Sequence, residues 1–244
     1  TTTSLTADDI HQLGLDEIQR LRKEMQSIMD EVNFEGDLAA FFQHVRDGKW
    51  NYYPDTDEGR KAYITDATAA IENIKSELPK FFGLMPKADL MVKRVEAFRE
   101  QDGAAQHYYP GTPDGSRAGT YYAHLSDMRA MPKNQLEVIA YHEGLPGHHM
   151  QISIQLEVED MPSFRKYGGY SVYAEGWALY SETLPKEIGL YKDPYSDFGR
   201  LSGELWRACR LVVDTGVHHY KWTREEGIDY YLNNTANPEG DCIG

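Results

Sequence analysis

The sequence predicts a mainly α-helical (α+β) fold with a small β-sheet. Apolar residues recur every three or four positions over long segments at both ends of the chain, which is typical of amphipathic helices. Two short segments in the middle are rich in β-forming residues, and the helical pattern resumes after Pro132. We expect one domain over residues 1–244, although this length would also allow two small domains.

The helices are predicted from apolar spacing and from their starting residues. Thr6 is a candidate N-cap with Asp9 three residues later, and Thr223 and Glu226 form a capping box. Helices are therefore expected over residues 6–32, 37–45, 56–78, 134–144, 163–184, 196–220 and 223–233.

Two strands are predicted between these helices. Residues 91–98 alternate between the two faces of a strand, and residues 118–125 are rich in β-forming residues. The second segment follows the turn-rich stretch PGTPDGSR. The order of helices, two strands and further helices indicates a small sheet within a largely helical domain.

The composition excludes several classes of protein. The net charge is −14 and no basic tract offsets it, which argues against a general nucleic-acid-binding protein. No apolar run approaches the roughly 20 residues of a membrane span. The two cysteines, Cys209 and Cys242, cannot form a disulfide framework and are not spaced as a metal knuckle. The composition indicates neither a compartment nor an oligomeric state.

The stretch AYHEGLPGHHMQ contains an incomplete zinc-hydrolase motif. In H-E-x-x-H, two histidines one helical turn apart bind the metal ion, and the glutamate beside the first acts as a base. His142 and Glu143 fill the first two places, but Pro146 stands where the second histidine is expected, and His148 and His149 come later. The same residues could instead form a helix end with a proline turn.

A straight helix would not bring these histidines together. At about 100° per residue, His148 is rotated roughly 120° from His142. His149 returns to within about 20° but lies roughly 10.5 Å further along the axis. The glycines and proline of residues 144–147 disfavour a continuous helix. We therefore predict a bulge or break there, which would turn a later histidine toward His142.

A third metal ligand is expected in the apolar helical segment SVYAEGWALYSE. Glu175 lies near its middle, with Tyr173 and Trp177 close by. Because carboxylates are seldom buried without a partner, a metal ion would compensate its charge. Glu175 could instead pair with an arginine or be exposed. Glu182, further along the segment, is expected to be solvated.

A polar stripe is predicted on the helix that follows. Arg207, Arg210, Asp214 and His218 are spaced by three, four and four residues, which places them on one face. The arginines could hold a substrate carboxylate, and His218 could donate a hydrogen bond to an oxyanion. The alternative is a solvated face stabilised by ion pairs.

Together these motifs resemble the bacterial family called domain of unknown function 885. The resemblance rests on AYHEGLPGHHMQ, YAEGWALYSE and LWRACRLVVDTGVHHYKWTREEGIDYYLNNT, and extends to GSRAGTYYAHL and LTADDIHQLGLDEIQRLRKEM. It covers nearly the whole chain. Members of the family are usually much longer, and this chain resembles their C-terminal part.

The resemblance implies a zincin-like helical metallopeptidase domain with a small β-sheet bordering the active-site cleft. By this likeness, His142, His148 and Glu175 would bind Zn²⁺, with His149 as the alternative to His148. Glu143 would be the general base.

The resemblance also implies roles for residues around the metal. The strand GTYYAHL would border the cleft and pair with an extended substrate, which makes His124, Tyr121 and Tyr122 candidates to face the site. Tyr170 and Tyr173 are candidates to stabilise a tetrahedral intermediate, Tyr173 as a catalytic residue and Tyr170 in substrate binding.

The predicted function is a zinc-dependent hydrolase that acts on peptides or small amides. A carboxypeptidase, a dipeptidase and an oligopeptidase are all compatible with the motifs. Two histidines and one carboxylate could instead bind non-haem iron, but an oxygenase needs no base such as Glu143 beside its first ligand. A further alternative is a non-catalytic binding module that keeps the same scaffold.

Overall fold

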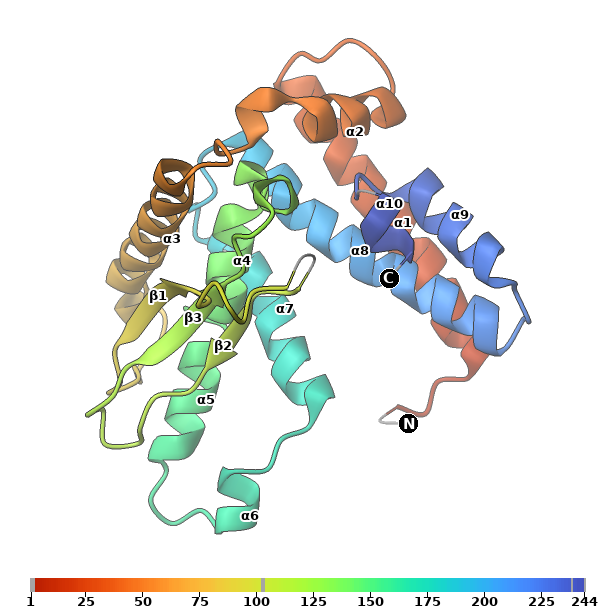
Figure 1. The fold of residues 1–244 in the computed structure, drawn as a ribbon. Helices are drawn as coiled ribbons and strands as arrows, with labels where there is room; N and C mark the ends of the chain where they lie inside the picture. Colours follow the sequence, from red (N-terminus) through yellow and green to blue (C-terminus); the bar gives the residue numbers. More distant parts are fainter. Residues whose placement is uncertain (1–2, 102–103, 238, 244) are drawn as a thin grey trace. The chain divides into compact units, whose positions relative to one another are not determined.

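Figure 1 shows the computed structural model, which describes residues 3–101, 104–237 and 239–243. Within these ranges the protein is mainly helical and has one three-stranded sheet, which confirms the predicted mainly α (α+β) class. The chain forms two compact units, a terminal unit of residues 1–51 with 193–244 and a central unit of residues 52–192. The single domain expected from the sequence stays a prediction.

The described part of the terminal unit is built from helices. They are α1 (Ala7–Glu31), α2 (Leu38–Asp47), the 3-10 helix η1 (Lys49–Asn51), α8 (Pro194–His218), α9 (Arg224–Asn234) and α10 (Glu239–Ile243). Thr6 and Asp9 cap α1 by reciprocal side-chain and backbone hydrogen bonds, and Thr223 and Glu226 cap α9 in the same way. Both capping motifs expected from the sequence are confirmed, because each satisfies N–H groups that a helix start leaves free.

α1 and α8 pack against each other in antiparallel orientation. His11 Nδ1 lies 2.8 Å from Thr215 Oγ1 near one end of the pair, and Arg200 lies 3.8 Å from Glu24 toward the other. The helices approach closely at Gly14, where a Cβ would lie 2.8 Å from a methyl carbon of Val212. Burial of apolar side chains stabilises this pair, including Ile18, Leu21, Met25, Leu201, Leu205 and Val212.

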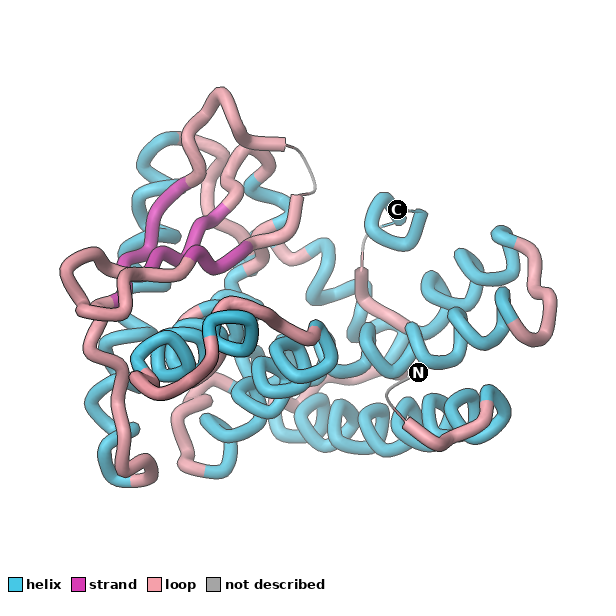
Figure 2. Tube along the Cα trace, turned by 90° about the horizontal axis from the view of Figure 1, so that it is seen from below, coloured by secondary structure: helices cyan, strands magenta, loops and turns pink. Residues whose placement is uncertain are grey.

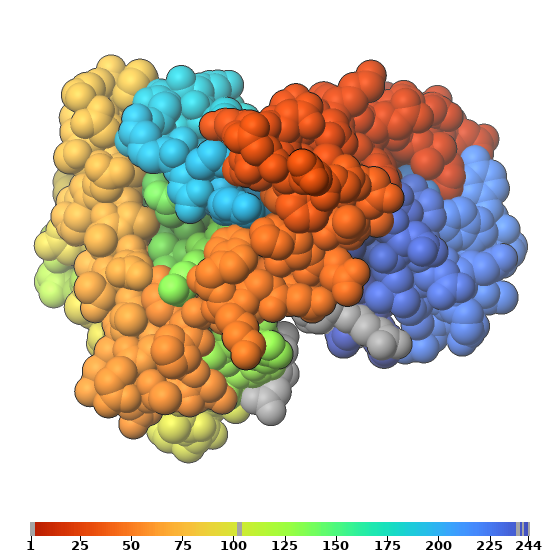
Figure 3. Space-filling model, turned by 90° about the horizontal axis from the view of Figure 1, so that it is seen from above, coloured from red at the N-terminus to blue at the C-terminus, as the bar shows by residue number. Residues whose placement is uncertain are grey.

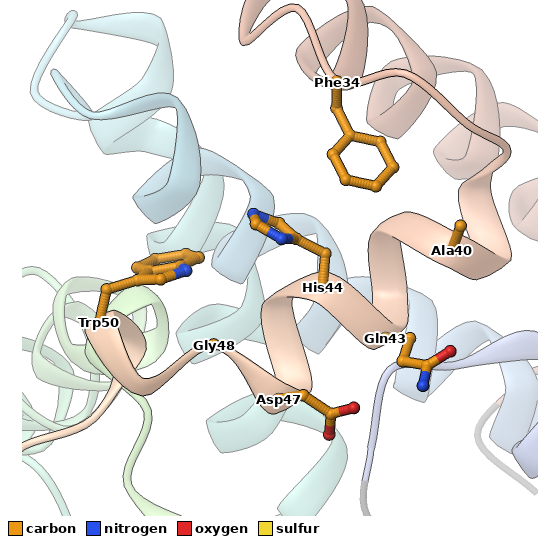
Figure 4. Close-up of a pocket in the computed structure, with 7 residues that line it drawn as sticks. All are labelled: Phe34, Ala40, Gln43, His44, Asp47, Gly48 and Trp50. Carbon is orange, nitrogen blue, oxygen red and sulfur yellow. The ribbon is translucent and has the colours of Figure 1, made fainter.

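A surface hollow of about 500 Å³ lies beside α2. Figure 4 shows the residues that line it, which are Phe34, Ala40, Gln43, His44, Asp47, Gly48 and Trp50. The His44 ring lies 5.1 Å from that of Phe34 and 5.8 Å from that of Trp50, measured between ring centres. None of the residues that we expect to act in catalysis or binding lines this hollow.

The central unit contains the sheet and the candidate metal motif. Its strands are β1 (Leu90–Arg94), β2 (His107–Tyr109) and β3 (Gly119–Ala123). Its helices are α3 (Asp57–Glu77), α4 (Leu136–Glu143), α5 (His148–Glu157), α6 (Ser163–Lys166) and α7 (Ser171–Glu187), with 3-10 turns η2 (Leu78–Lys80), η3 (Met128–Ala130) and η4 (Lys133–Gln135).

The central unit differs from the expected elements in several places, and α5 lies outside the helices predicted from the sequence. Both predicted strands are present but shorter, and β2 was not predicted because three residues carry too little pattern. The single helix expected over residues 163–184 is divided into α6 and α7. Gly168 and Gly169 lie in the connection, and neither residue favours a continuous helix.

β3 is the central strand of the sheet. It pairs in parallel with β1 and antiparallel with β2, so that Tyr121 lies opposite Val92 on one side and Tyr108 on the other. The expectation that this strand pairs with an extended substrate is therefore wrong, because its hydrogen-bonding groups on both sides are used within the sheet.

The two faces of the sheet have different surroundings. Figure 2 shows the strands as a layer on one side of the helices of this unit. Tyr121 is fully buried on the helix side, where its hydroxyl lies 2.8 Å from that of Tyr63 on α3. On the other face, the His107 ring lies 5.3 Å from Tyr122 and 5.4 Å from His124. α3 contributes much of the orange-to-gold surface of this unit in Figure 3.

Two further expectations concern membranes and cysteines. Across the ranges that the structure describes, no helix has both the length and the apolar character needed to span a bilayer. Cys209 and Cys242 are buried, and within the described ranges neither forms a disulfide. Burial raises the pKa of Cys209 to about 12, so this thiol is protonated at neutral pH.

We predict that Glu100→Gln destabilises the central unit. The Glu100 carboxylate accepts hydrogen bonds from Arg94, at 2.9 and 2.6 Å, and from the backbone N–H of Leu125, at 2.8 Å. The Arg94 hydrogen bonds, opposed by burial, lower its pKa. The substitution should lower the free energy of unfolding at pH 7 by ~1.5–3 kcal/mol, measured by urea denaturation.

The pH dependence gives a second measurement on the same variant. Because the folded pKa lies below the unfolded value of about 4.3, this stabilisation is complete above that value and is lost as the pH falls below it. The difference between wild type and Glu100→Gln should therefore shrink on going from pH 7 to pH 3.5. Glu96→Gln is the control, because the Glu96–Arg99 pair is exposed and contributes at most ~1 kcal/mol. Equal effects of the two substitutions would contradict the prediction.

Candidate metal centre

The motif helix is interrupted between His142 and His148. α4 ends at Glu143 and α5 begins at His148. In the interruption, the N–H of Gly147 donates to the carbonyl of Tyr141 at 3.0 Å, six residues back, instead of four as in a regular helix. The Leu145–Pro146 peptide bond is cis. The break predicted over residues 144–147 is confirmed.

The two glycines of this connection allow the chain to pass close to the end of α4. A Cβ at Gly147 would collide with the carbonyl oxygens of His142 and Tyr141. A Cβ at Gly144 would lie 2.6 Å from the carbonyl oxygen of Ala140 and 2.8 Å from Leu90. Both positions therefore require glycine for steric reasons, whatever their helix propensity.

The break brings three side chains together. His142 Nε2 lies 3.4 Å from one carboxylate oxygen of Glu175, and His148 Nε2 lies 3.6 Å from the other. The two imidazole rings lie edge to face with centres 4.7 Å apart. Residues from α4, α5 and α7 thus place two ring nitrogens next to the two oxygens of one carboxylate.

Glu175 is more exposed than its apolar sequence neighbours suggested. Its side chain is 62% exposed, whereas the side chains of His142 and His148 are each 11% exposed. The hypothesis of a buried carboxylate at this position is therefore wrong. Glu175 is thus the exposed member of this group of three side chains.

Glu182 is a member of the cluster that the sequence interpretation missed. Its side chain is 2% exposed, and one carboxylate oxygen lies 2.7 Å from Nδ1 of His142. The expectation of a solvated Glu182 is wrong, because its side chain packs against His142 on α4. Glu182 follows Glu175 by seven residues, and seven residues return a helix to within about 20° of the same face. That spacing was the signal that could have identified it.

The carboxylates around His142 change its pKa. Burial favours the neutral ring, but hydrogen bonds to Glu175 and Glu182 and the charges of Glu182 and Glu143 outweigh it, and raise the pKa of His142 to about 9. A cluster that stabilises a positive charge on this ring is also suited to a bound cation.

Glu143 is a buried member of the cluster, with 7% of its surface exposed. One of its carboxylate oxygens and one ring nitrogen each of His142 and His148 lie within 4.8 Å of one another. Its negative charge also contributes to the raised pKa values of Tyr63 and Tyr121, after the larger effect of burial.

His149 points away from this cluster. Its Nε2 lies 3.0 Å from the carbonyl oxygen of Ala88, and its Nδ1 lies 3.0 Å from the hydroxyl of Tyr108. Burial lowers the pKa of His149 to about 4, so the ring is neutral and joins α5 to the sheet. Of the two candidate histidines, the structure places His148 beside His142 and Glu175.

The tyrosines expected near the site have different surroundings. Tyr170 precedes α7 and Tyr173 lies in its first turn, with exposures of 79% and 60%. Tyr121 is buried against α3, whereas Tyr122 and His124 lie on the other face of the sheet.

The polar stripe lies on α8, in the terminal unit. His218 and Asp214 are exposed and 3.7 Å apart, and Arg207 donates to the carbonyl of Gly203 at 3.2 Å. The roles expected for Arg207, Arg210 and His218 at the metal site stay predictions.

We predict that Gly147→Ala destabilises the protein by ~2 kcal/mol or more in urea denaturation, because the added methyl group would collide with the end of α4. Gly176→Ala is the matched control. Its Cβ would meet nothing within 4 Å on an exposed helix position, and alanine should stabilise the helix by up to ~1 kcal/mol. A Gly147→Ala variant as stable as wild type would refute the steric role of this glycine.

The fold and the cluster define a mainly helical protein with a candidate metal centre at a broken helix. The chain belongs to a family described as "Bacterial protein of unknown function (DUF885)", whose profile matches residues 1–244. The resemblance inferred from the sequence motifs is thereby confirmed.

The fold of this chain also occurs in a solved structure. The chain is similar to "the putative lipoprotein from Colwellia psychrerythraea", seen in a crystal structure, with 37% sequence identity and a TM-score of 0.93. The match covers 99% of this chain and 42% of the length of that relative. No curated protein matches the chain.

Proposed function

We propose that this chain is a zinc-dependent hydrolase, more narrowly a metallopeptidase with a zincin-like catalytic domain that cleaves peptide or small amide bonds. The observation that carries the proposal is the convergence of His142, His148 and Glu175, with nitrogen-to-oxygen distances of 3.4 and 3.6 Å. Glu143 lies beside them as an additional carboxylate. This chain spans 42% of the length of the solved relative. The activity of the whole protein is therefore also a proposal.

The donor set supports Zn²⁺ as the cofactor. Nε2 of His142, Nε2 of His148 and an oxygen of Glu175 would hold the ion, and three protein ligands are typical of catalytic zinc sites. When bound, Zn²⁺ lowers the pKa of a water molecule and polarises a substrate carbonyl. Glu182 accepts a hydrogen bond from Nδ1 of His142, which orients this ring with Nε2 toward Glu175.

Glu143 is the proposed general base. Its carboxylate lies close to both histidine nitrogens, where it can accept a proton from a water molecule and transfer it to the leaving nitrogen. Its low exposure keeps bulk water away from this proton transfer. A base beside the first ligand favours a hydrolase over a non-haem iron oxygenase, although the same three donors also suit iron.

We predict that the protein binds one zinc ion per chain and that His142→Ala, His148→Ala and Glu175→Ala each remove it. Elemental analysis after dialysis would measure the zinc, and circular dichroism would check that the variants fold. Glu182→Gln should keep the site but weaken zinc binding by ~10–100-fold, because the orienting carboxylate is lost.

His107→Ala is the control for these variants, since His107 lies on β2 and its ring contacts Tyr122 and His124. It should retain zinc at the wild-type level. Iron without zinc in the purified protein, together with oxygen-dependent turnover, would contradict the hydrolase proposal.

We predict that Glu143→Gln keeps zinc and the fold but slows peptide hydrolysis by ~10²–10⁴-fold, because the proton acceptor is removed. The measurement is kcat/KM on a peptide that the wild-type protein cleaves, followed by mass spectrometry. Glu159→Gln, at an exposed position after α5, should leave the rate unchanged. Undiminished cleavage by Glu143→Gln would exclude Glu143 as the base.

A further inference from the structure

The segment before Glu175 exposes an unusual number of large apolar side chains. Between α6 and the first turn of α7, the exposed fractions are 56–79%, for Phe164, Tyr167, Tyr170, Val172 and Tyr173. We call these five residues the aromatic segment. Single exposed apolar residues are common, but a group of this kind marks a surface that binds another molecule.

The backbone of the aromatic segment is hydrogen-bonded to α5, the helix that carries His148. Gln155 on α5 donates hydrogen bonds to the carbonyls of Arg165 and Lys166, at 3.0 and 3.1 Å. Gln151, also on α5, donates to the carbonyl of Tyr173 at 3.2 Å. The backbone of the segment is therefore held beside α5, while its apolar side chains remain in solvent.

The segment also adjoins Glu175, the exposed member of the metal cluster. Val172 precedes Glu175 by three residues on α7, which places both on one side of the helix. Glu175 is the exposed member of the cluster, while Glu143 and both histidines are buried. A peptide that reaches the cluster from solvent would therefore pass the beginning of α7.

A buried acceptor lies at the same junction. Gln151 is 8% exposed, and among the described residues none donates a hydrogen bond to its side-chain oxygen. Gln151 follows His148 by three residues, so the two lie on neighbouring positions of one face of α5. An N–H group of a bound peptide is a donor that would satisfy this oxygen.

We propose that the aromatic segment is the apolar wall of the substrate site and selects peptides with a large aromatic or aliphatic residue at the position that contacts it. This inference rests on the proposed peptidase function and adds the class of substrate. Aromatic side chains suit this role because they present a large apolar area at a low cost in conformational entropy.

Peptide binding can be measured without cleavage in the zinc-loaded Glu143→Gln protein. Two fluorescein-labelled hexapeptides would be compared by anisotropy, identical except that the two central residues are Phe-Leu in one and Ser-Ser in the other. The Phe-Leu peptide should bind at least tenfold more tightly. Adding Tyr170→Ala or Tyr173→Ala should abolish most of this preference, whereas Tyr170→Phe and Tyr173→Phe should keep it, because the apolar ring is retained.

Phe98→Ala is the matched control, since Phe98 is 86% exposed and lies outside the aromatic segment. It should leave the preference unchanged. Equal binding of the two peptides, or a preference that survives both alanine variants, would overturn the inference. Loss of the preference in the phenylalanine variants would also overturn it, since the hydroxyl groups and not the apolar surface would then be responsible.

Cleavage by the wild-type protein separates this inference from the proposed function. If the Phe-Leu peptide binds selectively but is never hydrolysed, the inference that the aromatic segment binds apolar residues stands, and the hydrolase proposal fails. If both peptides are hydrolysed with equal kcat/KM and bind equally, the hydrolase proposal stands, and a selective role of the aromatic segment is excluded.

Discussion

The close approach of Gly147 to the last carbonyl groups of α4 is the contact on which the candidate site depends. Only a residue without a Cβ fits there, because any side chain would collide with the carbonyl oxygens of His142 and Tyr141. The approach lets the chain turn within four residues and begin α5 at His148. Two histidines that would be rotated by about 120° on a straight helix then lie with ring centres 4.7 Å apart. Tyr141 and Met150, buried in the same core cluster, anchor the helices on either side of the turn.

Near this turn, three carboxylates surround one imidazole ring, that of His142. Glu175 approaches Nε2 of His142 and Glu182 approaches Nδ1, while Glu143 follows directly in the chain. Burial alone would favour a neutral ring, yet the carboxylates raise the pKa of His142 to about 9. The arrangement that stabilises a proton on this ring is the same one that would stabilise a divalent cation between His142, His148 and Glu175. The electrostatics of the site and its proposed function therefore have one physical origin.

The sequence and the structure agree best where a property depends on neighbouring residues. The capping motifs at Thr6 and Thr223 were recognisable because the partners are three residues apart. The break over residues 144–147 was recognisable because glycine and proline act locally on the helix. The predictions failed where the outcome depended on distant residues: β3 became a central strand because β2 pairs with it, and Glu182 became buried through its contact with His142 on α4.

Local patterning along the chain was thus sufficient for the helical class, the small sheet and the interrupted motif. The choice of His148 over His149 as the neighbour of His142 required the folded chain. Both histidines follow the same turn, but the His149 ring forms hydrogen bonds with the carbonyl of Ala88 and the hydroxyl of Tyr108. A side chain's partner in the interior is set by which elements pack against it, and that packing brings together residues that no local pattern relates.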